Sequence, residues 1–547
     1  MENDSLKLKN LILYSLLFLV FLIPFLSMQN FSPATDEITH LPSGYSYLKT
    51  GEIKLNPQHP PLIKILAAFP LLFLDLKFDV SDLNLTGTQI KEWQFGVNFL
   101  SANGVDRVMF WGRIPMILLS VLLGWYIFIW GKELFGYEAG IFGLFIYALM
   151  PNIIAHSQFV TTDLGLAVFS FISLYYLWKF TENENKKSIV YSGLNLGFAL
   201  GSKFLAIFLL PIFLILISVY ILQKYRGSAW LSKLNLLLKI ILPIYGLAYL
   251  VIWALYFFPS DPLFYREGLK TVYADSNTVY YYYLNGNFDQ GGWWYYFLEA
   301  FAIKTPIPFL VVLLGSLIYY KKSGLNLLSS LFIFLPVALF LFVTARKAHN
   351  IGVRYVLVVY PFLILFVGGW LATIVKSLKF NIKSYSLKFK IFNFTLSLST
   401  LHFLLLTLFV WYVFSSISAY PDYLPYFSEL VGGSKNGYKY LDDSNIEWGY
   451  DLKRLAEYQT KYPDLKVAYA WDTFVNSSKL YGIKNILPLS LKESWWLNPS
   501  GRYAINTHVL VRTKLASEVY EDERLNWRDR YEPVDRIGQS FFIYEFP

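Results

Sequence analysis

Two adjacent carboxylates, Asp36 and Glu37, follow the first hydrophobic run of the chain, and His40, His59 and Lys64 come shortly after them. Ionisable side chains are costly beside the hydrocarbon region of a membrane, so this group is a candidate for function. A carboxylate can remove a proton from a hydroxyl or an amine, and a positioned base of this kind accelerates a reaction by about 10²–10⁴-fold. Neighbouring Asp and Glu side chains point in different directions, so only one needs to be the base. The other could hold a metal ion, a backbone amide or a cation. The alternative is that all these ionisable residues lie in an ordinary solvated loop without a function.

Other ionisable residues are expected at the same level of the membrane as Asp36. Each of them falls at the end of a predicted membrane span on the side of Asp36, or in a loop on that side. They are His156, Asp163, Lys203, Lys304, Arg346, Lys347, His349 and Arg354. Independent scatter would have put some of them in the apolar middles of the spans. The pattern predicts one polar cavity that opens on this side, lined by His40 and His59 and rimmed by the aromatic residues Trp293 and Trp294.

Several of these residues have a structural alternative. Asp163 stands where the cap of a helix would stand, and Lys203 and Lys304 could extend their ammonium groups to the membrane interface. A divalent metal ion is left open as a cofactor, with Glu37, His40 and His59 as the candidate ligands. The chain lacks the His-x3–5-His spacing of known zinc sites, which does not favour a metal.

The composition places the chain in a membrane. Of its 547 residues, 55% are hydrophobic and 16% are charged, and the mean hydropathy of +0.41 is too high for a soluble protein. The absence of cysteine excludes disulfides, thiolate metal sites and a cysteine nucleophile. No basic patch interleaves with aromatic residues on a soluble region, so we expect no nucleic-acid partner.

Eleven apolar stretches are predicted to be membrane spans, which need about 20 residues each. They are residues 11–29, 114–131, 138–156, 163–179, 188–204, 205–222, 238–257, 307–320, 327–344, 355–373 and 391–414. Alternate loops carry the lysines and arginines, most densely at residues 376–390, and the positive-inside rule places these loops in the cytoplasm. The amino terminus is then cytoplasmic and the carboxy-terminal region extracytoplasmic, in a multi-pass protein of the cytoplasmic membrane.

Two domains are predicted, a membrane domain at residues 1–419 and a soluble extracytoplasmic α/β domain at residues 420–547. The first outer loop, residues 30–113, carries two stretches that are apolar on one face and are expected to be interfacial helices, residues 41–49 and 61–74. The strand-like stretches of the soluble domain are residues 466–470, 503–512 and 539–546. This domain shows no nucleophile–base pair and no glycine-rich phosphate loop, so we assign it no chemistry.

Five motifs resemble those of one family: Asp36-Glu37, His59-Pro60-Pro61-Leu62, Thr162-Asp163, Lys304-Thr305-Pro306 and His349-Asn350-Ile351-Gly352-Val353-Arg354-Tyr355. The family is the polyprenyl-phosphate-sugar-dependent glycosyltransferases of the GT-C fold (glycosyltransferase family 39), which includes protein O-mannosyltransferases and lipid A aminoarabinose transferases. The stretch Tyr440–Leu452 looks like one in bacterial members. Two features depart from the mannosyltransferases: Val353 stands where they have Ser, and their eukaryotic β-trefoil insertion is missing. A Ser/Thr protein acceptor is therefore less well supported.

The resemblance implies a role for each motif. Asp36 would be the catalytic base, Glu37 would support the site, and Asp163 would be a second acidic residue near the acceptor or the donor sugar. The candidates for binding the donor phosphate are Arg354 first, Lys203 next, and then His349, Lys64 and Lys304.

We therefore predict a polytopic α-helical membrane protein of the GT-C fold, with about eleven transmembrane helices, that acts as an inverting glycosyltransferase. It would move a sugar from a polyprenyl-monophosphate carrier to a lipid, glycan or protein acceptor outside the cytoplasmic membrane, with the donor and membrane lipids as partners. One alternative is a ligase or polymerase that uses a diphosphate-linked oligosaccharide and needs more cations. Another is a secondary transporter of an anionic solute, which would carry polar residues near the membrane midplane and show internal repeats.

Overall fold

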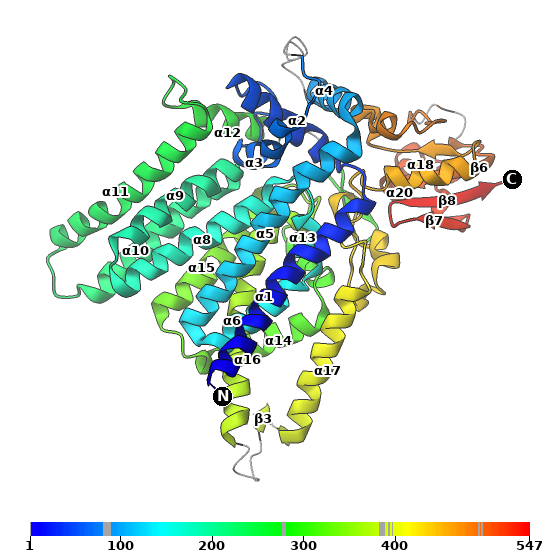
Figure 1. The fold of residues 1–547 in the computed structure, drawn as a ribbon. Helices are drawn as coiled ribbons and strands as arrows, with labels where there is room; N and C mark the ends of the chain where they lie inside the picture. The colour runs from blue at the N-terminus through cyan, green and yellow to red at the C-terminus, as the bar shows by residue number, and fades with distance from the viewer. Residues whose placement is uncertain are drawn as a thin grey trace.

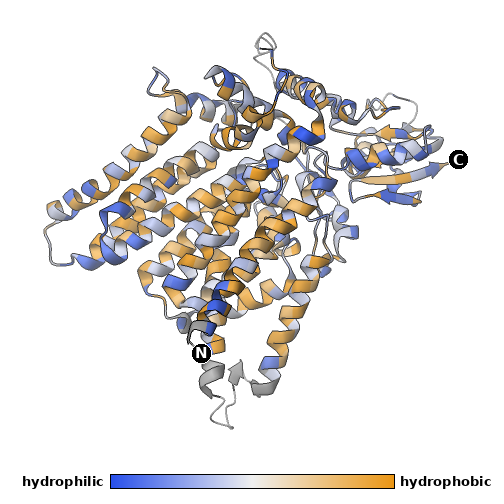
Figure 2. Ribbon diagram, viewed as in Figure 1, coloured by the Kyte–Doolittle hydropathy of each residue, from blue (hydrophilic) through white to orange (hydrophobic). Residues whose placement is uncertain are grey.

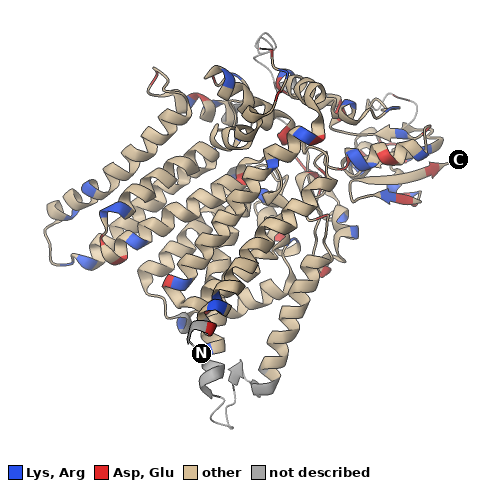
Figure 3. Cartoon of the chain, viewed as in Figure 1, with Lys and Arg blue, Asp and Glu red and all other residues tan. Residues whose placement is uncertain are grey.

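The computed structural model describes residues 2–79, 89–275, 280–381, 389–391, 394–396, 398–490, 493 and 496–547. Long helices form a bundle, and a smaller group of helices and strands that includes the carboxy terminus lies beside one end of it (Figure 1). Hydrophobic residues follow the long helices along most of their length (Figure 2), and the charged residues gather toward the helix ends and in the C-terminal region (Figure 3). This distribution is that of a membrane-embedded bundle.

Seven helices of the described part of the chain are long and apolar enough to cross a membrane. They are α1 (Glu2–Ser27), α5 (Val105–Phe135), α8 (Thr162–Asn183), α10 (Leu209–Lys224) with the 3₁₀ helix η4 (Phe204–Phe208) before it, α11 (Trp230–Leu255), α15 (Leu327–Lys347), and α16 (Tyr360–Asn381) with η6 (Val353–Val359) before it. The predicted multi-pass membrane protein is therefore confirmed.

Two bent pairs of helices would each add one span if the pair crosses the membrane as a unit. The helices α6 (Tyr137–Ala148) and α7 (Pro151–Ser157) meet at 67°, and α13 (Tyr296–Ile303) and α14 (Ile307–Ile318) meet at 118°. Prolines near the start of α7 and α14 favour these breaks. The two breaks are joined, because the Asn152 side chain of α7 donates to the carbonyl of Lys304, directly after α13, at 2.6 Å and to the Tyr360 hydroxyl at 2.9 Å. Backbone groups freed at membrane depth need such partners.

The two remaining predicted spans, residues 188–204 and 391–414, correspond to helices that are short. Length and composition therefore give seven to nine spans rather than eleven among the described residues. The helix α9 (Lys186–Ser202) is about 25 Å long, less than the thickness of the hydrocarbon core. It packs closely against α11, because a Cβ at Gly197 would lie 2.6 Å from Cβ of Val251. The apolar described part of α17 (Leu398–Ile417) is His402–Ile417.

The first loop contains three helices that lie across one end of the bundle (Figure 1). They are α2 (Thr35–Thr50), α3 (Leu62–Ala68) with η2 (Phe69–Phe73), and α4 (Gln89–Asn103). The sequence predicted a helix only from residue 41, but α2 begins at Thr35 because the Glu37 side chain accepts from the Ala34 backbone N–H at 2.9 Å and so caps its first turn. This early start puts Asp36 and Glu37 on a helix. The helix α12 (Phe264–Asp275) and the hairpin β1 (Tyr282–Leu284)–β2 (Asn287–Asp289) belong to a later loop.

The C-terminal region is built on a four-stranded sheet in the order β5 (Lys466–Ala468), β6 (Gly501–Asn506), β8 (Phe541–Phe546), β7 (Asp535–Ile537). The β5–β6 pair is parallel and the other two pairs are antiparallel. Its helices are α18 (Leu452–Lys461), α19 (Asp472–Val475) and α20 (Thr507–Tyr520), and a second hairpin, β3 (Phe389–Ile391)–β4 (Phe394–Leu396), precedes α17. The predicted strand 503–512 is wrong beyond Asn506, because the Asn506 side chain caps α20 by accepting from the His508 N–H.

Candidate active site

Four charged side chains from distant parts of the chain form a line of alternating charge. Asp36 lies in the first turn of α2, Arg354 near the start of η6, Asp163 in the first turn of α8, and Lys203 just after α9. Nη1 of Arg354 donates to Oδ2 of Asp36 at 2.6 Å and lies 3.9 Å from Oδ2 of Asp163. Nζ of Lys203 donates to Oδ1 of Asp163 at 2.5 Å. The sequence prediction that these four residues share one level corresponds to this contact.

Asp36 is the accessible end of this line. Its side chain is 24% exposed, whereas that of Asp163 is 1% exposed. Burial opposes the ionisation of Asp36, but the surrounding positive charge, chiefly that of the Arg354 guanidinium, outweighs burial, and the pKa of Asp36 lies below its usual value. Asp36 is therefore a carboxylate at neutral pH, which is the state that a general base requires.

Two buried polar atoms of this line, Nε of Arg354 and Oδ2 of Asp163, have no hydrogen-bond partner among the described residues. Buried polar atoms are usually paired, because an unpaired one costs about 1–3 kcal/mol. An unused guanidinium N–H suits a phosphate oxygen, and an unused carboxylate oxygen suits a sugar hydroxyl. The line thus has capacity to bind an anionic, hydroxyl-bearing molecule.

Glu37, the neighbour of Asp36, points into the protein interior. Its carboxylate accepts from Nε and Nη2 of Arg113 at 3.0 and 2.6 Å, and from the backbone N–H groups of Ala34 and Val160 at 2.9 and 2.8 Å. The other N–H groups of Arg113 donate to the carbonyls of Met28, Phe31 and Ser32. Both side chains are buried. Glu37 therefore joins α2, α5 and the turn before α8, and it is not free to act as a base.

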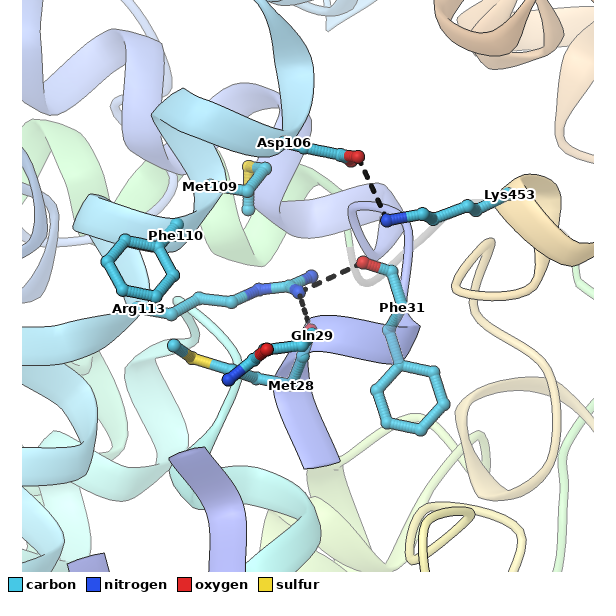
Figure 4. Close-up of a pocket in the computed structure, with 8 residues that line it drawn as sticks. All are labelled: Met28, Gln29, Phe31, Asp106, Met109, Phe110, Arg113 and Lys453. Atoms are coloured by element: carbon cyan, nitrogen blue, oxygen red, sulfur yellow. Dashed lines mark hydrogen bonds and ion pairs between the residues drawn. The ribbon is translucent and has the colours of Figure 1, made fainter. Parts of the chain in front are cut away.

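Arg113 was not identified from the sequence, although a signal exists: it is an arginine directly before the predicted span 114–131. A cavity of about 220 Å³ borders it, between the end of α1, the start of α5 and the C-terminal region (Figure 4). The lining residues are Met28, Gln29, Phe31, Asp106, Met109, Phe110, Arg113 and Lys453. Lys453 and Asp106 form an ion pair of 2.9 Å there. Asp36 is not in this lining and every N–H of Arg113 is already donated, so the cavity is not the reaction site.

The structure does not place Lys64 and Lys304 at the predicted donor phosphate, because protein oxygens surround both ammonium groups. Lys64 donates to the Tyr47 hydroxyl, the Asn56 carbonyl and side chain, and the His59 carbonyl, at 2.9, 2.7, 3.2 and 2.7 Å. Lys304 donates to the carbonyls of Leu424, Tyr426 and Asn445, at 2.9, 3.1 and 2.7 Å. A lysine has three N–H groups, so neither residue has one left for a ligand.

The candidate metal ligands Glu37, His40 and His59 do not form a metal site. Both oxygens of Glu37 are taken by Arg113, and Nδ1 of His40 bonds the Val160 carbonyl at 2.9 Å. Within the described ranges, no three His, Asp or Glu side chains are grouped as a metal would need. The two imidazoles instead pack edge to face, 5.1 Å apart, and burial lowers the pKa of both, so they are neutral at neutral pH.

The remaining candidates lie around the loop that precedes Arg354. Nδ1 of His349 lies 2.5 Å from the Tyr282 hydroxyl, and the backbone N–H of Trp293 donates to the Asn350 side chain at 2.6 Å. Trp293 is partly buried, whereas Trp294 is 66% exposed. The place of Trp293 and Trp294 at the rim of the cavity stays a prediction.

The C-terminal region reaches this site, which the sequence did not reveal. The indole of Trp448 lies against Arg354, with 4.2 Å between the guanidinium carbon and the ring centre. The Trp448 carbonyl accepts the backbone N–H of Thr35, directly before Asp36, at 2.7 Å. The signal that could have indicated this contact is the stretch Tyr440–Leu452, to which the sequence alone gives no role.

Comparisons with known proteins bear on the class of this site. Residues 103–255 match the family described as dolichyl-phosphate-mannose-protein mannosyltransferase. Among curated proteins, none matches the chain by sequence.

Among solved structures, the chain is similar to the oligosaccharyltransferase of Archaeoglobus fulgidus in the apo form, with a TM-score of 0.53, 10% identity, and coverage of 96% of this chain and 72% of that chain. It also matches ArnT from Cupriavidus metallidurans in the apo state, with a TM-score of 0.48, 12% identity, and coverage of 99% and 100%. A match to the S. cerevisiae Pmt1-Pmt2 complex bound to the sugar donor has a TM-score of 0.33 and 15% identity, over 48% and 34% of the chains. The likeness to the archaeal enzyme shows the fold.

Proposed function

We propose that this chain, a membrane glycosyltransferase of the GT-C fold, transfers one sugar from a polyprenyl-monophosphate carrier to an acceptor with inversion at the anomeric carbon. The fold expected from the motifs is confirmed, and the match of residues 103–255 to a mannosyltransferase family supports the enzyme class. The donor is proposed from the site and from the family description, which names dolichyl-phosphate mannose.

The observation that carries this proposal is the pairing of Asp36 with Arg354. Asp36 takes the proton of the acceptor hydroxyl or amine while the acceptor atom attacks the anomeric carbon. The bond from this carbon to the phosphate oxygen breaks, and its electron pair leaves with the phosphate. Arg354, held 2.6 Å from Asp36, stabilises the charge that grows on the leaving group. The products are the glycosylated acceptor and polyprenyl monophosphate.

The cations of the site favour a monophosphate donor over a diphosphate. Of the cations predicted to bind the donor phosphate, only Arg354 and Lys203 lie on the line of alternating charge, since Lys64 and Lys304 donate all their N–H groups to protein oxygens. Each of these two cations already faces a carboxylate, so the net charge offered to a donor is small. A diphosphate-linked oligosaccharide would need a stronger cationic site.

The setting of the reaction is part of the proposal. Charged residues at the helix ends and an α/β region beside α2 support a site that opens at one membrane face, which we assign to the outer face of the cytoplasmic membrane. The division at residue 420 and the cytoplasmic amino terminus stay predictions. The acceptor is a lipid, a glycan or a protein that presents a hydroxyl or an amine.

The experiment that tests the proposal measures the release of polyprenyl phosphate from a panel of polyprenyl-phosphate sugars by the purified protein. The Asp36→Asn variant is run in parallel, with Asp106→Asn as a matched control because Asp106 is an exposed acid that pairs with Lys453 outside the site. We expect donor-specific release by the wild type and by Asp106→Asn, and its loss in Asp36→Asn. No release from any donor by the folded wild type, with membrane lipid and candidate acceptors present, would refute the monophosphate donor.

A further inference from the structure

One segment of the C-terminal region, residues 442–452, joins the two loops that carry Asp36 and Arg354. We call this segment the strap. On the side of Arg354, the Asn445 side chain accepts the Val353 N–H at 3.0 Å, and the Ser444 hydroxyl donates to the Ile351 carbonyl at 2.8 Å. Both contacts fall within three residues of Arg354, so the strap fixes the backbone that carries the guanidinium.

On the side of Asp36, the strap bonds the chain that leads into α2. The carbonyls of Trp448 and Tyr450 accept the N–H groups of Thr35 and Ser32 at 2.7 and 3.0 Å. The Ser32 hydroxyl donates to the Gly449 carbonyl at 2.9 Å. Gly449 has φ +87°, a conformation that residues with a side chain rarely adopt, so this turn of the strap requires glycine.

Trp448 is the strap residue that touches the charged line. It is 2% exposed, and its indole lies 4.2 Å from the guanidinium carbon of Arg354, while Tyr355 contacts the same guanidinium at 5.5 Å. A guanidinium that lies on aromatic faces keeps its plane, and the directions of its N–H groups are then set. The unpartnered Nε of Arg354 belongs to this held group.

The C-terminal sheet region holds the strap in turn. Glu447, which is fully buried, accepts from the Gly449 N–H at 2.6 Å and from the indole N–H of Trp471 at 2.5 Å. Asp442 at the other end of the strap is bonded by Arg512 and His508 of α20. The strap is thus anchored in the region that carries the sheet and presents Trp448 to the membrane bundle.

We infer that Trp448 positions Arg354 for the donor, so that the C-terminal region completes the active site instead of only covering it. This inference rests on the proposed function through the role of Arg354. It makes Trp448 a positioning residue, because the indole acts on the donor through the guanidinium.

The test compares Trp448→Leu and Trp448→Phe with Trp527→Leu. Trp527 is a matched control, because it is equally buried in the same region but packs in the core with Trp496 and Phe546. For Trp448→Leu we expect kcat/KM for the donor to fall by roughly 10–30-fold, since a desolvated cation–π contact is worth about one to one and a half powers of ten. In the pH profile of kcat/KM for this variant, the acidic limb should also move to higher pH, because a displaced Arg354 no longer keeps the pKa of Asp36 low. Trp448→Phe keeps an aromatic face and should recover most of the rate.

Equal losses in Trp448→Leu and Trp527→Leu, with an unchanged pH profile, would overturn the inference while leaving the proposed function intact. Absence of donor turnover in the wild type would instead refute the proposed function. In that case, hydrogen exchange of residues 349–356 still tests the positioning. Faster exchange in Trp448→Leu than in Trp527→Leu supports it, and equal exchange contradicts it.

Discussion

Two neighbouring carboxylates of α2 each pair with an arginine, and the two pairs differ in how fully they are satisfied. In the Glu37–Arg113 pair both side chains are buried, and all five N–H groups of the guanidinium are donated to protein oxygens. In the Asp36–Arg354 pair the carboxylate is partly exposed, and Nε of the arginine has no partner in the described part of the chain. A saturated pair holds the fold together, whereas an unsaturated pair keeps the capacity to bind a substrate.

The largest effect on stability is expected when the saturated pair is broken. Arg113→Met leaves Glu37 as a buried charge without a partner, which costs about 3–5 kcal/mol. The thermal unfolding midpoint in detergent should fall sharply, and little folded protein should be recovered. The double variant Glu37→Met with Arg113→Met should regain part of that loss, because no uncompensated charge remains. An unchanged midpoint in Arg113→Met would contradict the structural role of the pair.

The unsaturated pair should respond in activity and not in stability. Arg354→Lys keeps the charge but loses the planar fork that can bond Asp36 and a phosphate together, so kcat/KM for the donor should fall by about tenfold or more. Arg502→Lys is the matched control, since Arg502 pairs with Glu545 in the C-terminal sheet, away from the site. Similar kinetic losses in both variants would remove the special role of Arg354.

The pH profile tests the same pair through its charge. Because Arg354 holds the pKa of Asp36 below its usual value, the base stays ionised as pH falls, and kcat/KM should decline only at a pH below the range in which an ordinary aspartate titrates. In Arg354→Ala the acidic limb should move upward. If the acidic limb of the profile stays in place in Arg354→Ala, a group other than Asp36 produces that limb.

Glu447 is a further buried carboxylate, but it faces neutral N–H donors where Glu37 faces an arginine. Burial raises its pKa to about 8 in spite of the hydrogen bond from Gly449. A raised carboxyl pKa means that stability is lost as pH rises from the unfolded value, about 4.5, to about 8, and then levels off. Unfolding midpoints between pH 5 and pH 9 should show this decline, and Glu447→Gln should flatten it. An identical decline of the unfolding midpoint with pH in Glu447→Gln would contradict the raised pKa of Glu447.

The smallest effect is expected at Trp294. Its ring is exposed and touches Tyr295, so Trp294→Ala should change donor kinetics by no more than about twofold. Steady-state rates with the preferred donor measure this. A tenfold loss would instead show that Trp294 contacts the donor.

The meeting of Asp36, Asp163, Lys203 and Arg354 could be expected from the sequence, because residues at the ends of spans share one level of the membrane. Which lysines remain available to a ligand could not be expected. The Lys304 ammonium donates its N–H groups to carbonyls of the C-terminal region that lie more than a hundred residues away in the sequence. Only the folded chain brings these groups together.

The number of spans and the start of α2 show the same limit. Apolar stretches predict helices well, but the breaks after Ala148 and Ile303 depend on side chains of distant segments that satisfy the freed backbone. The helix that carries Asp36 starts before the predicted one, because the capping side chain of Glu37 is itself held by Arg113. Periodicity describes one segment at a time and contains no information on such partners.

The most direct test of Asp36 as the base compares Asp36→Asn and Glu37→Gln, two isosteric changes at adjacent residues, for polyprenyl phosphate release and for thermal unfolding. We expect that Asp36→Asn unfolds like the wild type but loses about 10²–10⁴-fold in rate. Glu37→Gln should unfold at a clearly lower temperature, and its remaining folded fraction should keep most of the rate. Near-normal release by Asp36→Asn, or loss of rate in a fully stable Glu37→Gln, would contradict the assignment of Asp36 as the base.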